Sequence, residues 1–294
     1  MYRTPSGDAI VATVDFFTPI VDDPYDFGRI AAANSLSDVW AMGGRPLFAL
    51  SILAVPIKLG PEMPARIIEG AAAVAIEAGI PILGGHSVDD PVPKFGLVAI
   101  GIVDAGKMTT NRGARAGDVL YLTKPLGSGA MTGAIKKDGL SQEELRAVTA
   151  VMTTLNRAAG EAAVEARAHA ATDVTGFGLL GHLQKMMEGA GTKARVRVKD
   201  LPVITGARRF YESGQVPGGT KRNLEFYGKH ARFANGLTDA DQLLVADAQT
   251  NGGLLIVVPV DRAQTLEHAL RRQSVPVHRI GEVLAGDPGI VEFT

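Results

Sequence analysis

Short apolar segments alternate with alanine-rich helical segments in the first third of this 294-residue chain, and this alternation limits the folds it can adopt. Strands that alternate with helices are typical of α/β domains, in which helices cover the faces of a sheet. We predict strands at residues 10–14, 46–56, 80–83 and 95–103. We predict helices between them over residues 26–43 and 61–78. The second of these helices is followed by Gly79, and glycine commonly follows the last residue of a helix.

The rest of the chain has a similar mixture and predicts a second domain after a glycine-bearing junction at residues 113–118. Ser141 and Glu144 have the spacing of a capping box, which indicates the start of one or two helices over residues 141–167. Further elements are predicted as strands at residues 119–122, 170–174, 195–198, 254–258 and near 291, and as helices at 179–188 and 261–272. We therefore predict an α/β (α+β) fold of two domains, 1–105 and 115–294, with a site in or beside the cleft between them.

Composition and charge argue against several classes of function. Hydrophobic residues make up 46% of the chain, which is enough to form a large core. Lys and Arg number 30 and Asp and Glu number 31, so no excess of positive charge predicts binding to nucleic acid or an anionic membrane. The chain has no cysteine, which excludes disulfides, thiolate metal sites and a cysteine nucleophile within these residues. The first residues are polar and the apolar runs are too short to span a bilayer, so we expect a cytoplasmic protein.

The segment from Thr172 to Gly178 carries the strongest indication of chemistry. Asp173 ends an apolar stretch, Gly176 and Gly178 follow, and an apolar run with helical character begins next. A helix N-terminus attracts anions and a carboxylate attracts cations, so a metal-bound phosphate would explain both features. The alternative is an ordinary strand–helix turn. The glycines also match a dinucleotide fingerprint, which we disfavour because the acid before them would repel a bare pyrophosphate.

Three other segments carry candidate site residues. Asp15 ends the first strand, where it could also simply start a turn. Asn34 and Asp38 are four residues apart on an otherwise apolar helix face, where a cation or a Lys or Arg partner would compensate the carboxylate. Residues 84–87, Gly-Gly-His-Ser, predict a strand-end loop whose donors contact phosphate or nucleotide. His86 is the one histidine in a suggestive setting, and the other five are expected to be structural or on the surface.

Two further polar, glycine-bearing runs are ambiguous. Residues 218–223 and 247–253 could each be a loop or an anion contact, and Thr220 with Arg222 is the pair best suited to phosphate. Residues 101–108 nearly match a phosphate-binding P-loop, but Met108 stands where a hydroxyl residue would hold Mg²⁺. We therefore reject the P-loop interpretation.

Taken in order, these segments resemble the selenophosphate synthetase (selenide, water dikinase) family over essentially the whole chain. The matching segments are VDFFTPIVD from Val14, DFGRIAA from Asp26, SDVWAMGG from Ser37, GGHS from Gly84, KPLG from Lys124, the run from Thr172 to His182, VPGGT from Val216, and QTxGGLL from Gln249, where x stands for any residue. The ordered set is far more specific than any one of its members.

The resemblance implies a two-domain fold like that of aminoimidazole ribonucleotide synthetase, with the N-terminal domain forming a β-barrel in a homodimer. It implies phosphorylation of selenide by ATP, which yields selenophosphate, AMP and phosphate. Asp38 and Asp173 would bind Mg²⁺, and Asp15 would contact ATP or the metal. Nucleotide contacts, within the chain or across the dimer, are expected from Gly85, His86 and Ser87, and accessory roles from Asn34, Thr175, Gly176, Thr220 and Arg222.

The chain departs from the family pattern at its start. Family members carry a glycine-rich segment with a catalytic Cys or selenocysteine and an essential Lys, and this segment would lie before Met1. One hypothesis is an upstream UGA selenocysteine codon taken as a stop, and another is deliberate truncation. We therefore expect this chain to fold but to turn over poorly. The alternatives are a non-catalytic nucleotide- or metal-binding dimer and another enzyme of the superfamily, such as thiamine-phosphate kinase.

Overall fold

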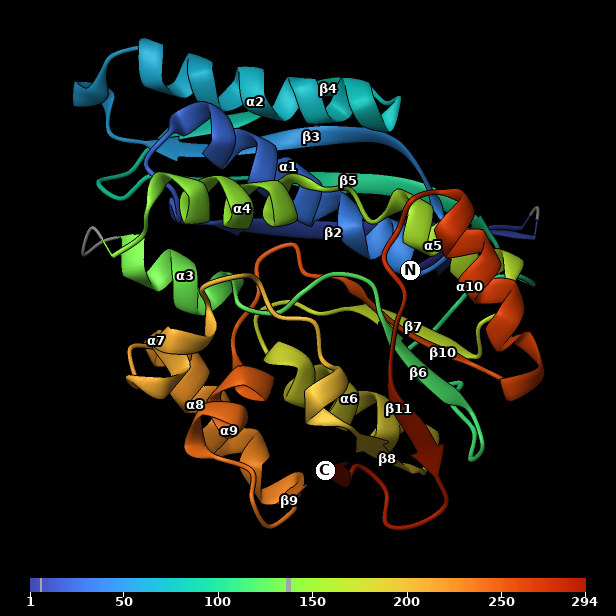
Figure 1. Ribbon diagram of the computed structural model, residues 1–294. Helices are drawn as coiled ribbons and strands as arrows, with labels where there is room; N and C mark the ends of the chain where they lie inside the picture. The colour runs from blue at the N-terminus through green and yellow to red at the C-terminus, as the bar shows by residue number, and fades with distance from the viewer. Residues whose placement is uncertain (6, 136–138) are drawn as a thin grey trace.

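The computed structural model describes residues 1–5, 7–135 and 139–294, and it contains two β-sheets that lie one above the other in Figure 1. The first sheet has the strand order β1-β2-β5-β3-β4. Its strands are β1 (Tyr2–Arg3), β2 (Asp8–Phe17), β3 (Arg45–Val55), β4 (Ile82–Asp89) and β5 (Lys94–Asp104). The pair β3 and β4 is parallel, and the other neighbouring pairs are antiparallel.

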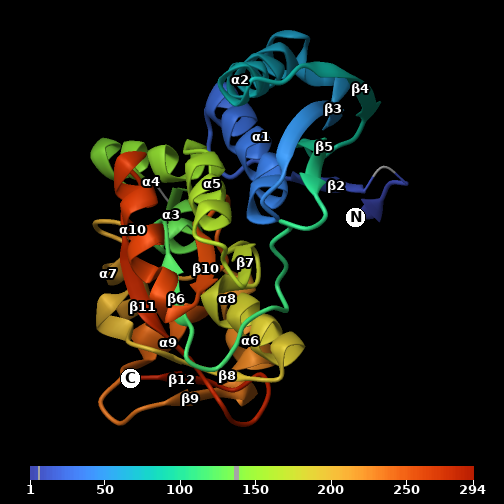
Figure 2. The ribbon, with the colours of Figure 1, turned by 90° about the vertical axis from the view of Figure 1, so that its right-hand side faces the viewer.

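Two helices cover one face of this sheet, as Figure 2 shows: α1 (Pro24–Ala41) and α2 (Glu62–Ala78). α1 begins at Pro24, after the N-cap Asp23, whose carboxylate accepts a hydrogen bond from the Asp26 N–H. Proline is favourable there because the first N–H groups of a helix have no partner within the helix. α1 is buried on nearly all sides, because it contacts the first sheet, α2 and the second domain. This environment explains why its sequence has no polar stripe.

The second sheet has the order β7-β10-β6-β11-β8-β12-β9 and is mostly antiparallel. Its strands are β6 (Val119–Leu122), β7 (Ala170–Asp173), β8 (Lys193–Val196), β9 (Ala231–Phe233), β10 (Leu254–Val258), β11 (His278–Leu284) and β12 (Val291–Phe293). The helices of this domain are α3 (Ser128–Ile135), α4 (Gln142–Thr153), α5 (Arg157–Glu165), α6 (Gly178–Ala190), α7 (Arg208–Glu212), α8 (Gly218–Tyr227), α9 (Asp239–Ala246) and α10 (Ala263–Arg272). The described residues also contain four short 3-10 helices: Ile57–Leu59, Val198–Asp200, Gly228–His230 and Val260–Arg262.

The α/β fold predicted from the sequence is confirmed, and the elements with strong local patterns are where the patterns placed them. β6 and β10 coincide with their predicted ranges. The capping box is also present, since the Ser141 hydroxyl accepts from the Glu144 N–H and the Glu144 carboxylate accepts from the Ser141 N–H. Helices α3, α7, α8 and α9 and strands β1, β9 and β11 were not predicted. The predicted end of the first strand before Asp15 is wrong, because β2 continues to Phe17.

The predicted loop at residues 84–87 is wrong, because β4 continues through them as the edge strand of the first sheet. A Cβ atom at Gly85 would lie 2.1 Å from the Ser51 carbonyl oxygen. The pairing of β3 with β4 also shifts register between Ala49 and Ser51. The glycine therefore permits a close approach of two strands at a bulge, and it does not end the strand.

The two domains meet along α1, which contacts α4, α5 and β7. Their buried side chains form one hydrophobic cluster that extends through both domains. The contact is close: a Cβ atom at Gly160 of α5 would lie 2.5 Å from the Trp40 carbonyl oxygen of α1. α1 is therefore the element that presents side chains of the first domain to the second. Within the described ranges, no helix is both long and apolar enough to cross a membrane.

Candidate functional site

Three carboxylates from separate elements converge where α1 meets the second domain. Asp15 lies on β2, Asp38 on α1 and Asp173 at the end of β7. Side chains alternate along β2, so Thr13 and Asp15 are partly buried and face α1, whereas Val14 between them is exposed. The Thr13 hydroxyl donates a hydrogen bond to Asp38 Oδ2 (2.5 Å), which ties the strand to the helix.

Burial and mutual repulsion raise the pKa of all three carboxyl groups. Burial, followed by the charge of Asp38, raises the pKa of Asp15 to about 6. Burial, followed by the charge of Asp173, raises the pKa of Asp38 to about 6. Burial also raises the pKa of Asp173, which is only 4% exposed. Three like charges at one place are unfavourable, and a cation bound beside them would relieve their repulsion.

His182 on α6 lies beside these carboxylates and has a structural role, as the sequence predicted. Its Nε2 accepts a hydrogen bond from the Thr175 N–H (3.1 Å), so this nitrogen carries no proton. Burial lowers the pKa of His182 to about 4, against the opposite effect of the Asp38 charge. The neutral imidazole therefore fixes the loop that follows Asp173.

Sequence reasoning missed Thr13 and the contact of His182 with the loop after Asp173, and each had a local signal. Thr13 precedes Asp15 by two residues on a strand, which places both side chains on one face. His182 lies four residues after Gly178 and therefore on the same face of the helix that opens beside Asp173.

The loop from Asp173 to Gly178 has a conformation that its glycines permit. Gly178 has a φ of 68°, and a Cβ atom there would lie 2.7 Å from the Ala246 backbone. The Gly176 carbonyl accepts a hydrogen bond from Asn223 Nδ2 (2.8 Å). The N–H groups of Thr175 and Gly178 are bonded to His182 and to the Thr175 carbonyl. The predicted anion contact is therefore limited to the remaining N–H groups of this loop.

Gly85, His86 and Ser87 are not close to the three carboxylates within one chain. They are exposed on β4 at the edge of the first sheet, and β3 and β5 separate β4 from β2. Neighbouring strands are about 4.8 Å apart, so β2 is roughly 14 Å away across the sheet. Of the two arrangements that the sequence allowed, nucleotide contact across a dimer fits this geometry better than contact within the chain.

Of the other predicted accessory residues, Asn34 and Thr220 are buried and hydrogen-bonded within the protein. Asn34 is buried and its Oδ1 accepts a hydrogen bond from the Asn251 N–H (2.8 Å). Thr220 is fully buried and donates to Asp247 Oδ1 (2.8 Å), so its predicted contact with an anion is not supported. Residues 218–223 form the start of α8 and are not a loop. Arg222 is exposed on that helix.

The donor set fits Mg²⁺, which prefers oxygen ligands and is usually held by one or two carboxylates together with water and substrate phosphates. Asp38 and Asp173 supply two such carboxylates. Among the residues that the structure describes, no group of three or more His, Cys, Asp or Glu side chains is placed so that it could hold a metal ion. A site that binds the metal together with a phosphate is consistent with both observations.

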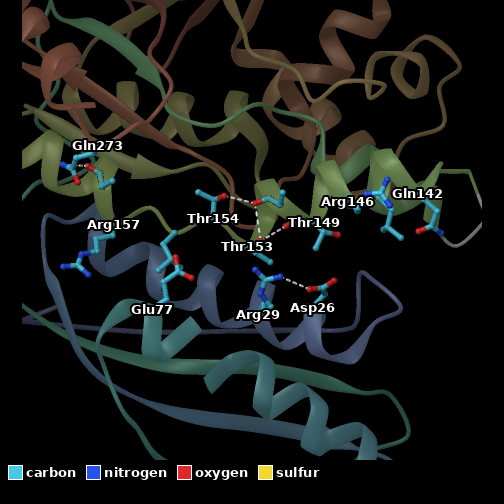
Figure 3. Close-up of a pocket in the computed structure, with 14 residues that line it drawn as sticks. Asp26, Arg29, Glu77, Gln142, Arg146, Thr149, Thr153, Thr154, Arg157 and Gln273 are labelled. Carbon is cyan, nitrogen blue, oxygen red and sulfur yellow. Dashed lines mark hydrogen bonds and ion pairs between the residues drawn. The ribbon is translucent and has the colours of Figure 1, made fainter. Parts of the chain in front are cut away.

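Several cavities lie near the domain junction, and two of them bear on the position of the site. One of about 620 Å³ is bounded by Thr13 and Asp38 on one side and by residues 109–112 and Thr172 on the other. A larger cavity of about 810 Å³ lies among α1, α2, α4 and α5, and Figure 3 shows Arg29 paired with Asp26 inside it. None of the three converging carboxylates lines the larger cavity. Of the three carboxylates, Asp38 lines the smaller cavity and Asp15 and Asp173 do not, so the smaller cavity adjoins the site at Asp38.

Both domains match models of one class of proteins. Residues 1–103 match the AIR synthase related protein, N-terminal domain, and residues 115–293 match the AIR synthase related protein, C-terminal domain. Fold and site together therefore define an AIR synthase related protein.

Relatives that align over nearly the whole chain identify the family within this class. The chain is 52% identical over 292 residues to the selenide, water dikinase of Myxococcus xanthus (strain DK1622), covering 99% of this chain and 83% of the relative. It is 46% identical over 289 residues to the selenide, water dikinase of Carboxydothermus hydrogenoformans, covering 98% and 84%. The chain belongs to the selenide, water dikinase family and is an enzyme of the kinase class, which confirms the resemblance seen in its motifs.

Solved structures show the same fold at low sequence identity. Thiamine-monophosphate kinase from Stenotrophomonas maltophilia K279a superposes with a TM-score of 0.76 at 21% identity, covering 99% of this chain and 86% of that one. Hydrogenase maturation protein HypE superposes with a TM-score of 0.73 at 19% identity, covering 97% and 84%. At these identities the similarity establishes the architecture alone.

Proposed function

We propose that this chain carries out ATP-dependent phosphorylation of selenide, which yields selenophosphate, AMP and phosphate. The observation that carries the proposal is the convergence of Asp15, Asp38 and Asp173 in a chain 52% identical to a selenide, water dikinase. These carboxylates come from both domains, so a nucleotide bound beside them would lie between the domains. ATP as the substrate also leads us to infer a cytoplasmic location.

The roles of the site residues follow from their contacts. Mg²⁺, when bound, would neutralise the phosphates and withdraw charge from the phosphoryl group that is transferred. Asp38 and Asp173 would hold the metal, and Asp15 would contact ATP or the metal. The Thr13 hydroxyl orients Asp38, and His182 holds the loop after Asp173. Because His182 is neutral, it adds no positive charge that would compete with the metal.

We also propose a homodimer formed through the uncovered face of the first sheet. Val14 and Phe16 on β2 are 52% and 50% exposed, and Leu50 on β3 is 37% exposed. Val98 of β5 pairs with both Val14 and Leu50, so these side chains form one apolar surface. A contiguous apolar surface of this kind indicates an interface. Closing it against a second copy would form the expected barrel, with Gly85, His86 and Ser87 of the partner subunit as nucleotide contacts.

Sedimentation velocity tests the dimer directly. Phe16→Glu places a charge in the proposed interface and should give a monomer where the unsubstituted chain gives a dimer. Phe226→Glu is the matched control, because Phe226 is 59% exposed on α8 of the second domain. A dimer that survives Phe16→Glu but is lost with Phe226→Glu would contradict the proposed face.

Catalytic turnover by these residues alone is expected to be slow. The chain contains no cysteine, so a thiol that could handle selenide is not among its residues. We therefore propose that this chain binds nucleotide and metal, and that it converts ATP to AMP only slowly. Fast selenide-dependent AMP formation by this chain would refute the expectation of poor turnover.

The deciding experiment combines binding with turnover under anaerobic conditions. Calorimetry measures MgATP binding, and phosphorus NMR follows selenophosphate and AMP with selenide as the acceptor. Asp38→Asn and Asp173→Asn should both weaken MgATP binding, whereas Asp90→Asn, at an exposed turn, should not. MgATP binding without any selenide-dependent AMP would favour the non-catalytic dimer. Phosphorylation of thiamine phosphate in place of selenide would refute the proposed substrate.

A further inference from the structure

Lys124 is the second residue after β6 and is buried, with 6% of its surface exposed. Its Nζ donates hydrogen bonds to the main-chain oxygens of Thr154 (2.6 Å) and Asn251 (2.8 Å). Burial lowers the pKa of Lys124 to about 7, and the charge of Asp173 acts in the opposite direction. A buried ammonium bonded to neutral acceptors lowers stability, so this lysine requires an explanation beyond core packing.

Asn251 connects the lysine to the first domain. It has a φ of 46°, in the left-handed region that few residues other than glycine adopt. Its N–H donates to Oδ1 of Asn34 on α1 (2.8 Å). Its Nδ2 donates to the main-chain oxygens of Met152 (2.6 Å) and Thr154 (3.0 Å), at the junction of α4 and α5 that Figure 3 shows. This one residue therefore joins the end of α4 to α1.

Asn156 makes a second connection between the domains. It is buried, and its Nδ2 donates to the Ser37 hydroxyl on α1 and to the Gly252 carbonyl, both at 2.8 Å. Ser37 directly precedes Asp38. The position of Gly252 is therefore tied to the turn of α1 that carries this carboxylate.

The same segment also reaches Asp173. The N–H of Val174, the next residue after Asp173, donates to the Gly253 carbonyl (2.9 Å). A Cβ atom at Gly252 would lie 2.1 Å from the Val174 carbonyl oxygen, so glycine is needed for this approach. Residues 251–253 therefore lie between the sequence neighbours of Asp38 and those of Asp173.

This network is costly for stability. Oδ1 of Asn156 and Oδ1 of Asn251 are buried without a hydrogen-bond partner among the described residues. A buried acceptor without a partner loses its hydrogen bonds to water and gains none in return. An apolar junction between the domains would be more stable, which indicates that the polar network is kept for the geometry it imposes.

We propose that Lys124, Asn156 and Asn251 form a cross-domain latch that sets the separation of Asp38 and Asp173. Lys124 is the positioning residue of this latch, because its ammonium holds the Asn251 carbonyl and the end of α4 together. The inference rests on the proposed function, in which these two carboxylates share one metal ion. Without the ammonium, residues 251–253 are released and the two halves of the metal site are no longer held in register.

The test measures Mn²⁺ binding by Lys124→Met, in which an apolar side chain of similar length replaces the ammonium. Electron paramagnetic resonance reports free Mn²⁺ in the presence of a non-hydrolysable ATP analogue. Groups that position metal ligands typically contribute about 10–100-fold in affinity, so the Mn²⁺ dissociation constant should rise at least about tenfold. The direction of the change in Mn²⁺ affinity distinguishes positioning from electrostatics. Removal of a positive charge near Asp173 would by itself strengthen cation binding.

Two further variants separate positioning from stability. Asn34→Ala removes the hydrogen bond between Asn251 and α1 without changing any charge, and it should also weaken Mn²⁺ binding. It decides the question if Lys124→Met does not fold. Thr220→Val removes a buried hydrogen bond to Asp247 elsewhere in the second domain, so it should lower the melting temperature and leave Mn²⁺ affinity unchanged.

The absence of cysteine allows a chemical rescue. Lys124→Cys introduces a unique thiol, and bromoethylamine in denaturant converts it to a lysine analogue before refolding. Recovery of Mn²⁺ affinity supports the role of the ammonium, and lack of recovery in a refolded protein overturns it.

The outcomes distinguish the latch from the metal site. Weaker Mn²⁺ binding in Lys124→Met or Asn34→Ala, but not in Thr220→Val at a comparable melting temperature, supports the latch. Unchanged Mn²⁺ affinity in the folded latch variants overturns it and leaves the metal site intact. Absence of Mn²⁺ binding by the unsubstituted chain overturns the metal site and the latch together.

Discussion

Replacing Asp38 with asparagine should stabilise the metal-free protein, although it removes a proposed metal ligand. Burial, and then the charge of Asp173, raises the pKa of Asp38 from 3.8 to about 6. A shift of about two units corresponds to roughly 3 kcal/mol against the charged form, at about 1.4 kcal/mol per unit. Asp38 is partly exposed and its titration is coupled to that of its neighbours, so we expect a gain of about 1–2 kcal/mol at pH 7.

The same shift fixes the sign of the pH dependence. A carboxyl group whose pKa is higher in the folded state binds its proton more tightly when folded. The free energy of unfolding of the unsubstituted chain should therefore fall as the pH rises from the unfolded value of 3.8 to the folded value of about 6. Asparagine does not titrate, so the stabilisation by Asp38→Asn should be full at pH 7 and much smaller at pH 4.5.

Urea unfolding in EDTA at the two pH values measures this difference. The chain has a single tryptophan, Trp40, which is buried on α1 close to Asp38 and reports the unfolding of this region. Asp90→Asn is the control of opposite sign, because Lys94 lowers the pKa of Asp90 and its charge is favourable. A lower unfolding midpoint for Asp38→Asn at pH 7, or an equal gain at both pH values, would refute the reasoning.

Three further outcomes are expected. Because burial lowers the pKa of His182 to about 4, NMR should show a neutral imidazole throughout the range from pH 5 to 8, and a midpoint above 6 would contradict the buried setting. Gly178→Ala should lower the melting temperature by an amount equivalent to about 1–3 kcal/mol, since φ is 68° and the added Cβ would meet Ala246. Tyr211→Phe removes a hydrogen bond to the buried carboxylate of Asp247 and should cost about 1–3 kcal/mol in urea unfolding, with no change in Mn²⁺ affinity.

Local sequence patterns predicted the helices and strands that are determined by residues close together in the sequence. β10 is a run of five buried apolar residues, and the capping box at Ser141 marks the start of α4. α8 was missed because it opens with two glycines, which disfavour helix. Its position is set by hydrogen bonds of Asn223 to Ala246, the last residue of α9, and of Thr220 to Asp247, the next residue. No window of sequence around α8 contains that information.

The residues of the candidate site also fall into those that local sequence indicates and those that depend on distant contacts. Asp15, Asp38 and Asp173 were identified because each is an acid at the end of, or within, an apolar element. Lys124 stands in the motif KPLG, but its two acceptors lie 30 and 127 residues away, so nothing near it in sequence indicates burial. Asn251 presents the same difficulty, because its left-handed conformation depends on contacts with the other domain.

A comparison of Asp38 with Asp247 shows what distinguishes a site carboxylate from a structural one. Burial raises the pKa of both to about 6, so the pKa alone does not separate them. Asp247 accepts hydrogen bonds from Tyr211, Thr220, Gln249 and the Ala130 N–H, which occupy both of its oxygens. Asp38 accepts from Thr13 on one oxygen and lies against another carboxylate, Asp173. A metal ligand must keep lone pairs open, so the open oxygen of Asp38 suits its proposed role, at a cost in stability that the fully bonded Asp247 avoids.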